Sequence, residues 1–153
     1  MRKNPRIDSS NNLPLKNPLE DLLGYQLRRA SQAMLSDLVS ALDEFALRPS
    51  SVSVLELVAS NPGITQSRIG QILAVERANM APITAKLTKQ GFLRRSRADG
   101  RSHGLHLTAE GKVAAATIRK RIAAHENKFW REAKAPERET MLAFLKSLWT
   151  EPV

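Results

Sequence analysis

Apolar residues recur at helical spacing along most of this chain, and short polar or proline-containing segments separate the periodic stretches. Two of these stretches follow each other closely in the middle of the sequence. The first begins at the polar residues Thr65-Gln66-Ser67 and ends near Val75, and the second ends at Gly91. Their apolar positions are Ile69, Ile72 and Leu73 in the first and Met80, Ile83 and Leu87 in the second. The spacing predicts two amphipathic helices joined by a short turn.

The pattern changes after Gly91. Phe92-Leu93-Arg94-Arg95 has strand character, Ala98-Asp99-Gly100-Arg101 is typical of a turn, and Leu105-His106-Leu107 is a second short strand. The order helix, turn, helix and two-stranded hairpin is that of a winged helix-turn-helix. In that arrangement the second helix lies in the DNA major groove, and the hairpin is the wing.

The segments on either side of this unit predict further helices. Residues 1–17 are polar and contain two prolines, so we expect a flexible N-terminal arm; a basic arm that touches DNA phosphates is the less favoured alternative. Residues 18–48 carry apolar positions at helical intervals and predict one long helix from Pro18 to Leu47, with the proline in its first turn.

The predicted DNA-binding unit occupies residues 49–108. Pro49-Ser50-Ser51 resembles a helix start, but the following valines are also compatible with a buried strand. We favour a helix because a winged helix needs a support helix there. In residues 109–153, Thr108 is a predicted N-cap for one helix, and a break at Ala135-Pro136 starts the last one. The expected fold is mainly α, with a small β-hairpin wing.

The charge balance favours a nucleic-acid partner. The 153 residues contain 24 Lys and Arg against 15 Asp and Glu, which gives a net charge of +9. Acidic membranes are also polyanions, but the chain has no long uncharged apolar run. Within the end of the second helix and the hairpin, the basic residues are opposed only by Asp99: they are Lys86, Lys89, Arg94, Arg95, Arg97 and Arg101. An ordinary solvated basic face is the alternative, although soluble surfaces normally mix both signs of charge.

The wing carries a specific motif. Asp99, Arg101, Leu105, Leu107, Thr108 and Gly111 fit the pattern D-x-R-x-x-x-L-x-L-T-x-x-G position by position. On these residues the chain resembles the multiple-antibiotic-resistance regulator (MarR) family, which usually has Gly-Leu-Ile where Gly91-Phe92-Leu93 stands here. The resemblance implies a ligand-responsive, dimeric, sequence-specific DNA-binding regulator, more often a repressor. It also implies that the terminal helices, residues 18–48 and 109–153, form the dimerisation platform.

One residue departs from that pattern. Pro82 lies within the predicted recognition helix, and it lacks the N–H that would bond to the carbonyl of Ala78. We therefore expect the helix to bend at Pro82 or to begin close before it.

We expect base contacts at the start of the second helix, where Asn79 can pair with adenine and Arg77 with guanine or a phosphate, and we expect Met80 in the core. Arg101 at the wing tip is expected to enter or follow the minor groove, oriented by Asp99. The predicted DNA-binding residues are Thr65, Gln66, Ser67, Arg77, Ala78, Asn79, Thr84, Lys86, Arg94, Arg95, Arg97, Asp99, Arg101 and Ser102.

A small-molecule effector is the second expected partner. The resemblance implies a pocket where the first long helix meets the DNA-binding unit, and polar groups adjoin an apolar stripe on that helix. The candidate ligand-binding residues are Tyr25, Arg28, Arg29 and Gln32. They suit an aromatic carboxylate or its acyl-thioester, with an arginine pairing the acid group. The alternative, which we weight more heavily, is that they are surface residues that pack or bridge subunits.

Other classes of function find little support. The chain has no cysteine, and His103 and His106 are three residues apart, which on a strand places them on opposite faces rather than on one metal. All three histidines are interpreted as ordinary surface or strand residues. No P-loop, dinucleotide fingerprint or nucleophile elbow occurs, so we expect no enzyme, metal or cofactor. The basic N-terminus lacks a signal peptide's apolar region, which favours the cytoplasm. The alternative function is an architectural or RNA-binding basic protein, although the hairpin lacks the interleaved aromatic residues that stack on single strands.

Overall fold

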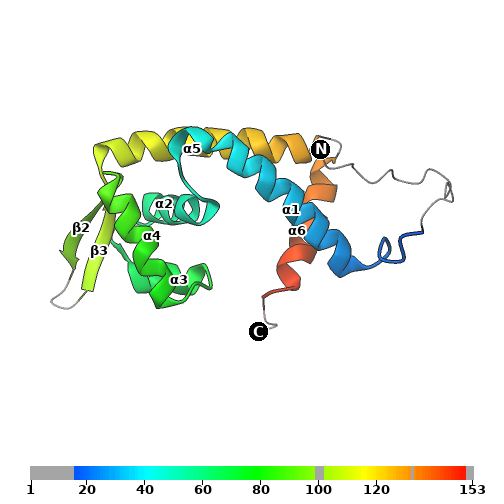
Figure 1. Cartoon of the computed structure of the whole chain (residues 1–153), viewed down its shortest axis with the longest axis horizontal. Helices are drawn as coiled ribbons and strands as arrows, with labels where there is room; N and C mark the ends of the chain where they lie inside the picture. The colour runs from blue at the N-terminus through cyan, green and yellow to red at the C-terminus, as the bar shows by residue number, and fades with distance from the viewer. Residues whose placement is uncertain (1–15, 99–101, 132, 151–153) are drawn as a thin grey trace, which may run out of the picture. The chain divides into compact units, whose positions relative to one another are not determined.

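The computed structural model describes residues 16–98, 102–131 and 133–150, without the side chains of residues 97, 98 and 102, and the chain divides into two compact units, Met1–Ala33 and Met34–Val153. Figure 1 shows the mainly helical fold with its small sheet. The elements are α1 (Leu23–Ala41), α2 (Pro49–Ser60), β1 (Ile64–Thr65), α3 (Gln66–Ile72), α4 (Arg77–Lys89), β2 (Leu93–Ala98), β3 (Ser102–Leu107), α5 (Ala109–Phe129) and α6 (Ala135–Ser147), with a 3-10 helix at Asp43–Phe45. This order confirms the predicted helices, turn and wing.

The first helix is shorter than its pattern predicted. The bounds Pro18 to Leu47 are wrong, because α1 runs only from Leu23 to Ala41. Before it, the side chain of Asn17 accepts a hydrogen bond from the N–H of Leu19 at 3.1 Å and holds a separate turn. After it, the 3-10 turn ends at Ala46, whose positive φ of 48° stops the helical backbone.

The core of residues 34–153 gathers around α2. Val54, Leu55 and Val58 of this helix are 0% exposed, as is Ile118 of α5. Because α2 is surrounded by other elements, its apolar residues are not confined to one face. Its sequence therefore lacks a clear helical period and also resembled a buried strand. The choice of a helix at residues 49–60 is confirmed.

The sheet has three antiparallel strands in the order β1-β3-β2, where two strands were expected. The additional strand, β1, pairs Ile64 with Leu105 and Thr65 with Gly104. A side chain at Gly104 would begin 2.9 Å from the carbonyl oxygen of Gly63, so this pairing needs a glycine on β3. A strand of two residues is too short to display an alternating pattern, so β1 could not be predicted from hydrophobic periodicity.

The start of α5 is joined to the end of α4 by a compact hydrogen-bonded junction. Thr108 caps α5, since its Oγ1 accepts from the N–H of Gly111 at 2.9 Å, and the same hydroxyl donates to the carbonyl of Gly91 at 2.6 Å. Its own N–H donates to the carbonyl of Phe92 at 3.1 Å. A Cβ at Gly111 would lie only 2.0 Å from that same Phe92 oxygen. Thr108 and Gly111, read in the sequence as part of a wing motif, therefore fix the wing to α5.

The last helix begins as predicted, with Pro136 in its first turn and the N–H of Lys134 donating to Glu137 Oε2 at 2.6 Å. None of its residues is buried. Large apolar side chains here are 44–75% exposed: Met141, Leu142, Phe144, Leu148 and Trp149.

We predict that Gly111→Ala lowers the free energy of unfolding by about 2–3 kcal/mol or more, because the added methyl group overlaps the Phe92 carbonyl. Urea unfolding followed by circular dichroism measures the loss. The matched control is Gly24→Ala in α1, where nothing lies within 4 Å of the added carbon and no loss is expected. Equal unfolding free energies for Gly111→Ala and the parent would contradict the tight junction.

Candidate nucleic-acid interface

The helix-turn-helix is held by close backbone contact and by a partly buried hydrogen bond between its two helices. Thr65 caps α3, where its Oγ1 accepts from the N–H of Arg68 at 3.2 Å. A side chain at Gly70 would begin 2.8 Å from the carbonyl of Val75, so the turn into α4 needs a glycine there. The turn also contains Ala74 with a positive φ of 50°. These constraints set α3 against the start of α4.

Thr84 is not a DNA contact. Its side chain is 0% exposed, and its hydroxyl lies 3.0 Å from Oε1 of Gln66 and 3.1 Å from the carbonyl of Ala81. A buried hydroxyl needs such a partner, and Gln66 of α3 provides it. The prediction that Thr84 faces DNA is therefore wrong. Its hydroxyl instead joins α4 to α3 within the helix-turn-helix.

The first turn of α4 presents the side chains expected to read bases. Arg77, Ala78 and Asn79 are exposed, whereas Met80 is 1% exposed and packs in the core, as predicted. The helix begins at Arg77 and continues through Pro82 to Lys89. Pro82 is exposed, and it still leaves the Ala78 carbonyl without the usual i to i−4 bond.

Three elements converge on a shallow hollow of about 260 Å³, which we call the DNA-facing hollow after the predicted DNA-binding residues that line it. The start of α3, the first residue of α4 and the hairpin line it with Thr65, Gln66, Ser67, Arg77, Arg95, His103 and Leu105. Five of these seven were predicted DNA-binding residues. His103 was instead interpreted as an ordinary surface or strand residue, although its place on the basic hairpin was a usable signal.

Arg94 lies apart from that set. It is next to Arg95 on β2, and adjacent strand residues point to opposite faces of a sheet. Arg94 pairs with His106 and Arg95 with Leu105, and the two arginines line different cavities. The two arginines that were predicted together as DNA contacts therefore lie on opposite faces of the hairpin, and a DNA contact by Arg94 stays a prediction. His103 and His106 divide in the same way, as expected from their spacing.

The remaining predicted DNA contacts are Lys86 and four residues of the wing. Lys86 is exposed, and its Nζ donates to the carbonyl of Ala46 at 3.1 Å. Asp99 and Arg101 at the wing tip, and the side chains of Arg97 and Ser102, lie outside the described residues.

The predicted ligand-binding residues all lie on α1, in the unit Met1–Ala33. Tyr25 is half-buried, with the Arg28 guanidinium 5.5 Å from its ring centre and Asn17 Nδ2 3.3 Å from its hydroxyl. Arg29 and Gln32 are exposed.

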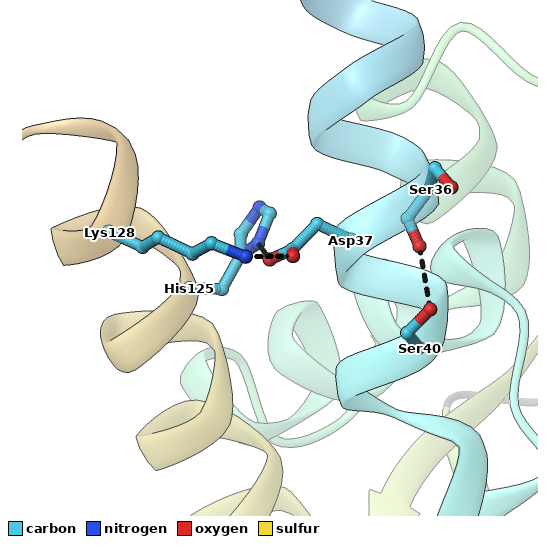
Figure 2. A network of polar contacts seen from close by, with 5 residues as sticks. All are labelled: Ser36, Asp37, Ser40, His125 and Lys128. Carbon is cyan, nitrogen blue, oxygen red and sulfur yellow. Dashed lines mark hydrogen bonds and ion pairs between the residues drawn. The ribbon is translucent and has the colours of Figure 1, made fainter.

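Sequence reasoning missed a polar network around His125. This residue is not on the surface or on a strand: it lies on α5, is 5% exposed, and packs edge-on against Phe129. Figure 2 shows His125 and Lys128 pointing from α5 to Asp37 of α1, where His125 Nδ1 lies 3.0 Å from Asp37 Oδ2 and Lys128 donates to Oδ1. Asp37 is 88 residues from His125 in the sequence, so no local pattern could predict that the two side chains pair.

Asp37 is held ionised by these two donors. The hydrogen bond from Lys128, followed by that from His125, keeps the pKa of Asp37 below its ordinary value of 3.8. An ionised carboxylate only accepts hydrogen bonds, so His125 carries its proton on Nδ1. The network links the end of α1 to the far half of α5.

The arrangement of a capped α3, an exposed α4 start and a basic hairpin defines a winged-helix DNA-binding protein. The family model described as "MarR family" matches residues 47–103. A solved structure of the transcriptional repressor CouR bound to a 23-mer DNA duplex is 32% identical, with a TM-score of 0.84 over 90% of this chain and 100% of that one. The chain belongs to the MarR family and is a DNA-binding transcriptional regulator.

Two further relatives are consistent with this assignment. CouR bound to p-coumaroyl-CoA is 30% identical, with a TM-score of 0.80, and the match covers 91% of this chain and all of that one. A putative transcriptional regulatory protein for the hcr operon of Thauera aromatica is 27% identical over 132 residues, which is 84% of this chain and 80% of the relative. The family consists of regulators rather than enzymes. Among the helices that the structure describes, none has the length and apolar character to cross a membrane.

We predict that Asp37→Asn lowers the free energy of unfolding near neutral pH, because two cationic or hydrogen-bonding partners lose their carboxylate. A depressed folded-state pKa contributes stability that is present above the unfolded value and lost as pH falls through the folded one. The difference between parent and variant should therefore persist to pH 3.8 and vanish only below it. Urea unfolding at a series of acidic pH values tests this.

The control is Asp43→Asn, which removes an exposed carboxylate outside the network. A parent-to-variant difference that is absent near neutral pH, or equal to that of the control at every pH, would contradict the stabilising role of Asp37.

Proposed function

We propose that the protein is a repressor that binds a pseudo-palindromic operator as a homodimer and releases it when a small aromatic acid or its thioester binds. The observation that carries DNA recognition is the DNA-facing hollow, where α3, α4 and the hairpin bring Ser67, Arg77, Arg95 and His103 together. Hydrogen-bond donors from three elements around one concave surface suit the backbone and base edges of a duplex.

Within this interface the proposed roles differ. Asn79 and Arg77 at the exposed start of α4 contact base edges, where an amide suits adenine and a guanidinium suits guanine. Arg95 and His103 on the hairpin contact phosphates. We retain Arg97, Asp99, Arg101 and Ser102 as wing contacts on the strength of the sequence motif, and we leave out Thr84 and Arg94.

The proposed dimer rests on the C-terminal apolar surface. Trp149 is 75% exposed and Met141 50%, and exposed patches of this kind mark interaction sites. Pairing with a second copy would cover them. A two-fold dimer presents two α4 helices to half-sites about 34–36 Å apart, which implies an operator with matching symmetry. Its DNA target implies action in the cytoplasm.

We predict that Asn79→Ala weakens operator binding by about 1–3 kcal/mol while leaving binding to a shuffled duplex nearly unchanged, because a base contact is lost. Arg95→Gln should weaken both and reduce the salt dependence by about one phosphate contact. Fluorescence anisotropy with the protein's own upstream region, at several salt concentrations, gives these values. Footprinting should show two half-sites about one helical turn apart.

Lys120→Gln is the control, because Lys120 is exposed and lies on α5, outside both α4 and the hairpin. Equal affinity of the parent for operator and shuffled duplex would overturn sequence-specific regulation and favour an architectural or RNA-binding protein.

The effector is proposed from the relatives and from α1. CouR, at 30% identity, is described in complex with p-coumaroyl-CoA, an aromatic acyl-thioester. On α1 of this chain, Tyr25 supplies an aromatic ring and Arg28, Arg29 and Gln32 supply polar groups. A ligand releases DNA only if it binds the DNA-incompetent state better, and a tenfold release needs about 1.4 kcal/mol of such preference.

We predict that an aromatic acid or its coenzyme A thioester lowers operator affinity of the parent, and that Arg29→Ala and Tyr25→Phe lose this response while still binding the operator. Anisotropy titrations of the protein–operator complex with both forms of p-coumarate measure it. If both variants respond like the parent, the effector binds elsewhere.

A further inference from the structure

A second cavity lies on the opposite face of the hairpin from the DNA-facing hollow. This rear cavity has a volume of about 380 Å³, opens to solvent, and is lined by the end of α2, the hairpin and the first half of α5. Pro62, Leu107 and Ala116, which are exposed or half-buried, contribute its apolar wall. Arg94, His106, Lys112 and Arg119 contribute polar groups. It shares no lining residue with the DNA-facing hollow.

The rear cavity carries uncompensated positive charge. Arg119 is neutralised by Glu56, whose Oε2 lies 2.8 Å from Nη2 and 2.9 Å from Nε. Arg94 and Lys112 have no acidic partner among the described residues. Two cations beside one cavity, with no carboxylate to balance them, attract an anion.

His106 is fixed at the edge of this cavity. Its Nε2 lies 2.9 Å from Ser96 Oγ, and its ring lies against Gly63, where an added Cβ would come within 3.6 Å of Cε1. The ring is half-buried. Within the described part of the chain, Nδ1 has no hydrogen-bond partner, so it remains available to a ligand in the cavity.

We propose that the rear cavity binds a small organic anion with a flat apolar body, such as an aromatic carboxylate. The acid group binds Arg94 and Lys112, and the body covers the wall formed by Pro62, Leu107 and Ala116. A volume of about 380 Å³ lies within the range of small-molecule sites. The combination of apolar wall and paired cations selects against both a bare anion and a neutral ring. This site is separate from the effector site proposed on α1.

The test uses the protein's three histidines as local reporters, without DNA. Their ring resonances, assigned by single His→Gln variants, are followed by nuclear magnetic resonance during titration with benzoate. The His106 signals should shift saturably, whereas those of His103, on the other face of the hairpin, and of His125 should not. Benzyl alcohol and inorganic phosphate at the same concentrations should give no saturable shift.

Matched variants locate the charge. Arg94→Gln and Lys112→Gln should each weaken benzoate binding at His106 by about tenfold or more, the loss expected for a charge-assisted hydrogen bond. Arg95→Gln, one residue away on the opposite face, and Lys120→Gln on α5 should leave it unchanged.

Three results would overturn the proposal. Equal benzoate affinity in Arg94→Gln, Lys112→Gln and the parent places binding elsewhere. Inorganic phosphate shifting His106 as tightly as benzoate indicates only a basic surface. Loss of the His106 shift in Arg29→Ala, with Arg94→Gln unaffected, assigns it to the α1 site. Because DNA is absent, failure of operator binding would not affect these outcomes.

Discussion

The position of the hairpin relative to α4 depends on one constraint, the contact of Gly111 and Thr108 with the Gly91–Phe92 turn. Three hydrogen bonds of Thr108, at 2.6–3.1 Å, and the room left by a missing Cβ bring the first turn of α5 onto the backbone that follows α4. The hairpin leaves and returns at this one point, so its position relative to α4 is set there. The T-x-x-G part of the wing motif is therefore structural, while the D-x-R part remains the proposed DNA contact.

Sequence patterns predicted the features that depend on residues close together in the chain, such as helices, caps and apolar faces. Helical periodicity located α3 to α6, and the order of a winged helix decided that α2 is a helix. Thr108 was identified as a cap, and Met80 was assigned to the core. What failed depended on distant partners. Thr84 is polar and looks exposed until Gln66 of another helix provides its hydrogen bond, and His125 is buried because Asp37 pairs with it. The division between Arg94 and Arg95 is different, since strand alternation alone contained that information.

The hairpin has two chemically distinct faces within one thin sheet. On one face Arg95 and His103 join α3 and α4 around the DNA-facing hollow, and on the other Arg94 and His106 join α2 and α5 around the rear cavity. Part of the positive charge of the hairpin therefore lies on the face away from the DNA-facing hollow. Charge counting identified a polyanion partner correctly but treated the basic hairpin as a single surface. The register of β2 and β3 is what separates the two.

α5 is one uninterrupted helix from the wing junction to the Asp37 network. At 1.5 Å per residue, Gly111 and His125 are about 21 Å apart along its axis. A rigid rod of that length acts as a lever arm: a tilt of about 10° at one end displaces the other by roughly 4 Å. A change in the direction of α5 at the wing junction is therefore converted, at its other end, into a displacement comparable to the rise of one DNA base pair.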